Sequence, residues 1–129
     1  MNISSQSLSE LTAGSQVVYR RLHTTPESIA SFCKRWQIVE LAVFGSILRK
    51  DFRSEGTKAS DADFLYTSAP EARYGFQFFN MKAELSQLVR RDVDLISKRG
   101  IENSRNPLRR KEILESARVI YAQRSAVAY

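Results

Sequence analysis

Apolar residues in the first half of the chain recur with helical spacing and then form an uninterrupted run. The first stripe, spaced i, i+3, i+4 and i+7, consists of Ile29, Phe32, Cys33 and Trp36. It predicts a helix that begins at Pro26, with Thr25 as its N-cap, and that buries this face in a core. The next run, residues 38–44, contains β-branched residues and ends at a glycine, so it predicts a strand buried on both faces.

The second half of the chain continues this alternation of strand and helix. Short apolar runs at residues 61–66 and 93–96 predict two further strands. Between them, a helix over about residues 74–90 is predicted by a stripe of Phe78, Met81, Leu85 and Leu88. A last helix, beginning at Asn106-Pro107, is predicted by a stripe of Ile113, Leu114, Ala117, Ile120 and Tyr121. The first 24 residues predict only one or two helical turns, carried by Leu8, Leu11, Val17, Val18 and Leu22. This order predicts an α/β fold, with a small sheet flanked by helices.

Size and composition indicate one globular domain. The chain has 129 residues, of which 43% are hydrophobic and 26% charged, as in ordinary soluble domains. No apolar run approaches the ~20 residues of a membrane span, and the first residues do not form a secretory signal. The lone cysteine, Cys33, excludes an internal disulfide. With a single histidine, His23, it also excludes a zinc site built from sulfur and imidazole. We therefore expect a cytoplasmic protein without a membrane partner.

Positive charge is concentrated in the second half of the chain. The net charge is +6, and residues 65–129 carry twelve Lys/Arg against seven Asp/Glu, compared with eight against seven in residues 1–64. A basic half indicates an anionic partner, although a solvated basic face has the same composition. The cluster Arg109-Arg110-Lys111 begins the last predicted helix, where cations oppose the helix dipole. It is either an anion contact, with nucleotide or partner, or a solvated cluster.

Two features suggest chemistry. Gly45-Ser46 directly follows a predicted strand and precedes a segment, residues 47–50, that can start a helix. Such a junction directs backbone N–H groups and a hydroxyl at one point, which suits a phosphate, although Gly-Ser is also a common turn. Asp61 and Asp63 lie two residues apart at a predicted strand, so their carboxylates share one side. A divalent cation such as Mg²⁺ would relieve their repulsion, whereas a plain turn is the alternative.

A third carboxylate, Asp94, lies within the short apolar strand Val93-Asp94-Leu95-Ile96. A charge in a buried strand is costly unless it is paired or binds a cation, so Asp94 is a further candidate ligand. The neighbouring Asp92 is expected to be solvated. Three carboxylates from two strands and a Gly-Ser junction therefore form the candidate site.

This set resembles the DNA polymerase β-like nucleotidyltransferase superfamily and, within it, the minimal nucleotidyltransferase (MNT) antitoxins of HEPN/MNT toxin–antitoxin pairs. The resemblance covers residues 26–122. It is carried by Gly45-Ser46, then Arg49 and Asp51, then Ser60 before Asp61-Ala62-Asp63, then Asp94, and finally an Asn106-Pro107-headed helix ending in Ile120-Tyr121. Residues 1–25 would be an N-terminal extension and residues 123–129 a C-terminal tail. The polar residues 53–58 resemble an insertion, and residues 1–24 have no family counterpart.

The resemblance implies a small mixed β-sheet of the polymerase β-like fold and a function. Asp61, Asp63 and Asp94 would be the catalytic residues and would hold two Mg²⁺ ions. Nucleotide binding would fall to Gly45, Ser46, Arg49 and Ser60, with ATP as the substrate. The implied partner is a cognate HEPN ribonuclease toxin, neutralised by AMP transfer to a tyrosine, with no direct DNA binding required. Two alternatives remain open: an antitoxin that masks the toxin without catalysis, and a nucleotidyltransferase that acts on a small molecule or an RNA end.

Overall fold

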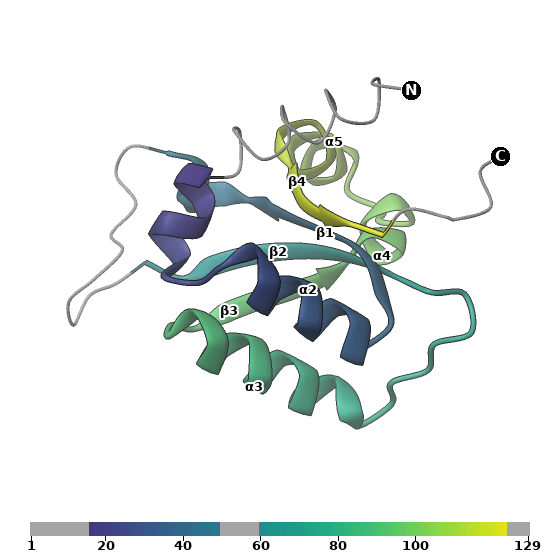
Figure 1. Ribbon diagram of the computed structural model, residues 1–129. Coiled ribbons are helices and arrows are strands. Elements are labelled where there is room, and N and C mark those ends of the chain that lie inside the picture. Colours follow the sequence, from purple (N-terminus) through teal and green to yellow (C-terminus); the bar gives the residue numbers. More distant parts are fainter. Residues whose placement is uncertain (1–15, 50–59, 124–129) are drawn as a thin grey trace, which may run out of the picture.

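A four-stranded sheet forms the centre of the fold (Figure 1). The computed structural model describes residues 16–49 and 60–123. Its strands are β1 (Ile38–Phe44), β2 (Ala62–Ser68), β3 (Val93–Ser97) and β4 (Arg118–Ala122). Their order is β3-β2-β1-β4. Strand β1 is antiparallel to both β2 and β4, whereas β2 and β3 are parallel. The predicted α/β class with a small mixed sheet is confirmed.

Helices cover both faces of this sheet. One face carries residues 16–22, α2 (Pro26–Arg35) and α3 (Gln77–Val89), and the other carries α4 (Lys98–Glu102) and α5 (Pro107–Ser116) (Figure 1). Because strand side chains alternate, Leu41 and Val43 of β1 join the first core, whereas Ala42 and Phe44 join the second. None of the described helices is both long and apolar enough to span a bilayer.

The predicted helix starts are confirmed by their caps. Thr25 Oγ1 accepts a hydrogen bond from the Ser28 N–H at 3.1 Å, and Asn106 Oδ1 accepts one from the Arg109 N–H at 3.1 Å. Each cap satisfies an amide that the first helical turn leaves without a partner. Trp36, expected in the core, follows α2 as its C-cap and is only half-buried. Its indole N–H therefore reaches Glu84 Oε1 at 2.9 Å.

The predicted C-terminal helix is wrong beyond residue 116. Ala117 is extended, with φ −63° and ψ 141°, and the chain continues as β4 along the edge of β1. Ile120 and Tyr121 are strand-forming residues that also fit the helical stripe, so periodicity alone misassigned them. Pairing with β1 favours the strand, because it provides hydrogen-bond partners for backbone N–H and C=O groups at the edge of β1. The family-like pattern of a helix ending in Ile120-Tyr121 is corrected in the same way.

Two further helical elements are short. Residues 16–22 are helical and bury Val18 and Leu22, as the weak N-terminal pattern predicted, whereas Val17 of the same pattern is exposed. Leu8 and Leu11 lie outside the described residues. Helix α4 was not predicted, because its five residues are too few to show a period.

Candidate active site

The predicted site residues meet at the end of the sheet where β1 ends and β2 and β3 begin (Figure 1). Asp63 of β2 lies opposite Phe44, the last residue of β1, and also opposite Asp94 of β3. Asp61 directly precedes β2. The strand register therefore brings the two carboxylates of Asp63 and Asp94 to one face of the sheet, beside the turn that starts at Gly45.

Asp94 does not have the environment that the sequence predicted. Strand β3 is the edge of the sheet, and its side chains alternate between buried Val93, exposed Asp94 and buried Leu95. The argument from a costly buried charge at Asp94 is therefore wrong. Asp61 is exposed as well, whereas Asp63 is half-buried. Because Asp63 is the least solvated of the three, it has the greatest electrostatic need for a positive partner.

The charge of Asp63 is opposed by its surroundings. Burial, the neighbouring Asp94 and, more weakly, Asp61 raise its pKa from 3.8 to about 6, and Arg49 acts in the opposite direction. Part of the effect comes from a hydrogen bond between the side chains of Asp63 and Asp94. A carboxylate whose charge is opposed in this way is a favourable oxygen ligand for a hard cation.

The three carboxylates are suitable ligands for Mg²⁺, but in this structure they are not yet arranged around one point. Among residues 16–49 and 60–123, no three His, Cys, Asp or Glu side chains already converge on one point. Asp63 and Asp94 form the assembled pair, and Asp61 lies within electrostatic range of Asp63. All three donors are carboxylate oxygens, the ligands that Mg²⁺ prefers. The donor set therefore suits a divalent cation.

Gly45 is fitted closely against Asp63. Its φ is +77°, and a Cβ atom at this position would lie 2.3 Å from Asp63 Oδ2. Only glycine combines this backbone conformation with such an approach. The turn that follows, η1 (Gly45–Leu48), is one turn of 3₁₀ helix, and Arg49 after it is extended. The predicted helix start at residues 47–50 is thus limited to a single turn, and Lys50 lies outside the described residues.

The remaining predicted nucleotide-binding residues surround this turn. Ser46 Oγ donates to the Asp61 carbonyl at 3.4 Å, which connects the turn to the start of β2. Arg49 is exposed beside the turn, and the Ser60 carbonyl accepts a hydrogen bond from Arg91. Asp51 and the polar residues 53–58 lie outside the described residues. The phosphate-binding roles of Gly45, Ser46, Arg49 and Ser60 stay predictions.

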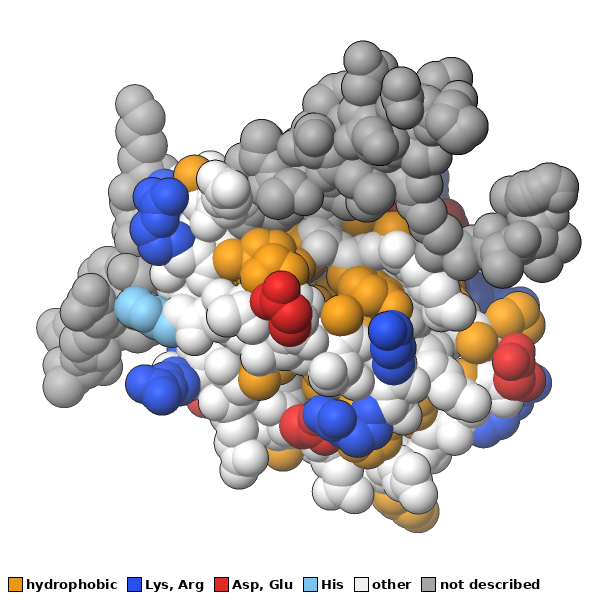
Figure 2. All heavy atoms as spheres, viewed as in Figure 1, with side chains coloured by type: hydrophobic (Ala, Val, Ile, Leu, Met, Phe, Trp, Pro, Cys, Tyr) orange, Lys and Arg blue, Asp and Glu red, His pale blue; other side chains and the backbone are white. Residues whose placement is uncertain are grey.

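Two clefts border this end of the sheet, one beside α5 and one beside α3. The α5 cleft, of about 440 Å³, lies between the Gly45 turn and α5, and its lining includes Gly45, Arg49, Asp63, Arg109 and Glu112. The α3 cleft, of about 450 Å³, lies between α3 and the start of β3, and its lining includes Asp61, Asp94, Phe79, Lys82 and Ser86. Of the predicted basic cluster, Arg109 thus faces the α5 cleft, whereas Arg110 donates to the Ser104 carbonyl. Lys and Arg side chains are otherwise dispersed in the view of Figure 2.

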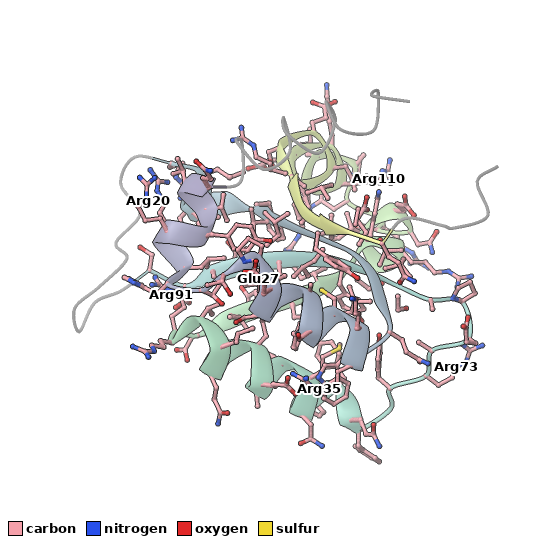
Figure 3. The ribbon with its side chains drawn as sticks, viewed as in Figure 1. Arg20, Glu27, Arg35, Arg73, Arg91 and Arg110 are labelled. Carbon is pink, nitrogen blue, oxygen red and sulfur yellow. The ribbon has the colours of Figure 1, made fainter. Side chains whose placement is uncertain are left out.

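Sequence reasoning missed two arginines that hold the site together. Arg91 is only 8% exposed, and its guanidinium donates to the carbonyls of Ser60 (3.1 Å) and Arg21 (3.2 Å). The Arg21 guanidinium in turn donates to the carbonyls of Ile47 (2.5 Å) and Arg49 (2.7 Å). Figure 3 shows Arg91 beside the helix that carries Arg20 and Arg21. No pattern marked these residues, because a buried arginine and a solvated one look alike in a basic chain.

Arg21→Ala is expected to destabilise the Gly45 turn. It removes two charge-assisted hydrogen bonds, so we expect the free energy of unfolding to fall by about 1–2 kcal/mol. Amide hydrogen exchange at residues 45–49 should accelerate in the same variant. Arg20→Ala, an exposed change on the same helix, is the control and should cost less than about 0.5 kcal/mol. Equal values for the two variants, from urea unfolding, would contradict a positioning role for Arg21.

Asp63→Asn is expected to stabilise the protein at neutral pH in the absence of divalent cations. Because the folded state raises the pKa of Asp63 to about 6, folding binds this proton more tightly than the unfolded chain does. The contribution of Asp63 to stability is therefore greatest below pH 4 and falls as the pH rises to 6. Because Asp63 is partly solvated, we expect a gain of only about 1 kcal/mol at pH 7.5.

Urea unfolding with EDTA present at pH 4 and pH 7.5 measures this difference. The gain should disappear at pH 4, where the wild-type carboxyl is protonated in the folded state. A gain of equal size at both pH values would mean that Asp63→Asn stabilises by packing rather than by removing a charge.

Several solved structures are similar to this chain in fold. A solved structure described provisionally as a minimal nucleotidyltransferase matches with a TM-score of 0.51 and 29% identity, over 71% of this chain and 85% of that one. A toxin–antitoxin structure with AMP-PNP matches with a TM-score of 0.55 and 14% identity, over 78% and 75%. A third, a tri-AMPylated Shewanella oneidensis HEPN toxin in complex with MNT antitoxin, gives 0.50 and 14%, over 76% and 70%. No curated protein sequence matches the chain.

A protein-family match covers most of the chain. The model of the nucleotidyltransferase domain matches residues 26–120. That match begins with α2, ends within β4 and contains Gly45, Asp61, Asp63 and Asp94. The strand order that pairs Asp63 with Asp94 and the close approach of Gly45 lie wholly inside it. The chain therefore belongs to the nucleotidyltransferase domain family.

Proposed function

We propose that this chain is an antitoxin that transfers AMP from ATP to a tyrosine hydroxyl of a HEPN ribonuclease toxin in the cytoplasm and thereby neutralises it. The observation that carries the proposal is the pairing of Asp63 with Asp94 directly beside Gly45. This arrangement places oxygen ligands next to a turn with a closely approachable backbone. Of the structures with the same fold, one contains AMP-PNP and another an AMPylated HEPN toxin.

Binding of ATP would be shared between the Gly45 turn and the α5 cleft. Gly45 and Ser46 would contact the β- and γ-phosphates, and Arg49 adds a positive charge at the same rim. Arg109 lies across the α5 cleft from this turn and can meet the nucleotide from the other side. Two Mg²⁺ ions held by Asp61, Asp63 and Asp94 would neutralise phosphate charge and lower the pKa of the attacking hydroxyl.

The transfer itself is one in-line displacement. The tyrosine Oη forms a bond to the α-phosphorus, and its proton passes to a carboxylate oxygen of Asp94. The bond from the α-phosphorus to the bridging oxygen breaks, and pyrophosphate leaves. Asp94 suits the proton transfer because it is exposed at the sheet edge, where an acceptor from another protein can reach it.

Intact-mass spectrometry of the partner tests the proposal. The HEPN-type protein encoded beside this chain is incubated with ATP, Mg²⁺ and this protein, and we expect its mass to rise by one or more AMP units. A Tyr→Phe series on the partner then identifies the acceptor. A fall in ribonuclease activity without any gain in mass would favour the non-catalytic antitoxin. Label incorporated into RNA ends or small molecules instead would favour the other alternative.

A further inference from the structure

The α5 cleft opens onto the face of the sheet that bears the paired carboxylates. Asp63 lies opposite both Phe44 of β1 and Asp94 of β3, and residues that lie opposite one another in neighbouring strands point to the same face. Phe44 packs with Ile113 of α5 in the second core, and all of Phe44, Asp63 and Ile113 line the α5 cleft. A nucleotide with its phosphates at Gly45 and Asp63 would therefore extend into this cleft without leaving that face.

Glu112 is the acidic residue on the α5 wall of this cleft, and the proposed function gives it no role. It lies three positions after Arg109, so an ion pair between the two is within reach. In the part of the chain that the structure describes, however, neither side chain forms an ion pair or a hydrogen bond. Ser116, on the same wall, already donates its hydroxyl to the Glu112 carbonyl at 2.7 Å. The Glu112 carboxylate therefore offers the cleft an acceptor that no described residue occupies.

We infer that Glu112 is a specificity-determining residue, which binds the ribose of the nucleotide by accepting hydrogen bonds from its hydroxyl groups. This inference rests on the proposed function and names a further contact of the same substrate. A carboxylate accepts hydrogen bonds but does not donate them, and the same is true of ionised phosphate. Beside a triphosphate, Glu112 is therefore favourable only where the ligand presents donors. In ATP these donors are the ribose hydroxyls and the adenine amino group.

The position of Glu112 favours the ribose over the adenine amino group. The ribose is bonded directly to the α-phosphate, which the proposed function places at the carboxylates of Asp63 and Asp94. Glu112 lines the same cleft as Asp63, whereas the amino group is at the far end of the nucleoside. The two oxygens of one carboxylate can also accept hydrogen bonds from two neighbouring hydroxyls at once. The ribose is thus the donor group closest to the carboxylates that hold the α-phosphate.

The rest of the cleft suits a nucleoside. Its volume of about 440 Å³ lies within the range of about 300–1,000 Å³ that is typical of small-molecule sites, which combine apolar walls with a few polar groups. Leu48 on the side of the Gly45 turn and Ile113 on the side of α5 supply apolar walls against which a base can pack. The cleft therefore has room for the sugar and the base beyond the carboxylates.

Isothermal titration in the presence of Mg²⁺ tests the ribose contact. The probes are the α,β-methylene analogue of ATP, which cannot release pyrophosphate, and its 2′,3′-dideoxy form, which lacks both ribose hydroxyls. We expect the unaltered protein to bind the ribose form at least about tenfold more tightly than the dideoxy form. Glu112→Ala should reduce this preference below about threefold, because it weakens binding of the ribose form and not of the dideoxy form.

Glu115→Ala is the matched control. It removes the same charge from an exposed position of α5 that lies outside the cleft lining, so it should keep the full preference for the ribose form. Because Glu112 and Glu115 are both exposed, neither change should unfold the protein, which a melting curve verifies.

The outcomes separate this inference from the proposed function, because binding is measured without the partner. Equal affinity of the unaltered protein for the two probes overturns the ribose contact, and so does a preference that Glu112→Ala leaves intact. A changed preference between the adenosine analogue and its guanosine counterpart, with the ribose preference intact, assigns Glu112 to the base and also overturns it. Absence of AMP transfer, with a ribose preference that Glu112→Ala removes, overturns the proposed function but supports the ribose contact. Failure of both probes to bind overturns both.

Discussion

Asp63→Asn is expected to reduce AMP transfer at least about a thousandfold while the chain stays folded. Asp63 connects the two parts of the candidate site, the carboxylate pair and the Gly45 turn, since it lies opposite Asp94 and directly against Gly45. The amide keeps the shape of the side chain but loses the charge that would hold Mg²⁺, which is worth several kcal/mol of barrier. Transfer of radiolabelled AMP to the partner measures the loss.

The control for Asp63→Asn is Glu71→Gln, which makes the same change of charge at an exposed position after β2. It should transfer AMP within about twofold of the unaltered protein. The distinguishing result is that Asp63→Asn loses activity while gaining stability at pH 7.5 without metal. Loss of activity together with a large fall in melting temperature would instead assign Asp63 a structural role. Turnover that is unchanged would refute the two-metal mechanism.

Gly45→Val is expected to have the second largest effect, with transfer falling at least about a hundredfold and affinity for an ATP analogue at least about tenfold. Any side chain at this position is strained at φ +77°, and its Cβ would displace the Asp63 carboxylate. Branching at Cβ adds bulk where the backbone must approach phosphate. Isothermal titration with the analogue measures binding, and Ser46→Ala, which removes only a hydroxyl, should be milder.

Gly75 provides a matched control for this strain. It also has a positive φ, +54°, but a Cβ there would meet nothing within 4 Å. Gly75→Ala therefore reports the cost of the backbone conformation alone, about 1 kcal/mol. Gly45→Ala should cost more and should also impair nucleotide binding, because it adds the contact with Asp63. If Gly45→Ala and Gly75→Ala changed stability and nucleotide binding equally, the close approach of Gly45 to Asp63 would not contribute to function.

The features that could be predicted from the sequence are those set by residues close together along the chain. Caps at Thr25 and Asn106, the strand before Gly45 and the spacing of Asp61 and Asp63 are local patterns, and the structure pairs Asp63 with Asp94. The reason given for Asp94 was nevertheless wrong. Its strand proved to be an edge, and strand order depends on pairings between distant segments that a short apolar run does not encode.

The remaining errors have the same origin. Residues 118–122 form a strand because β1 offers them an edge, which a count of apolar spacings in this segment cannot reveal. Arg21 and Arg91 were missed because their partners are backbone carbonyls, and those carry no side-chain signature. The candidate site residues could therefore be predicted from the sequence more readily than the strand pairings and backbone hydrogen bonds that position them.

The link between Arg21 and Arg91 also bears on how this protein can be divided. The family match begins at Pro26, so a chain shortened to that residue would retain every proposed metal and nucleotide ligand within the described residues. It would lose the guanidinium that holds the Ile47 and Arg49 carbonyls and the Tyr19 hydroxyl that holds Ile120. The buried side chains of Val18 and Leu22 would leave the core as well. The residues that match the family model thus include the proposed metal and nucleotide ligands but omit residues that hold the Gly45 turn and the core in place. A shortened version of this domain should therefore include residues 16–25.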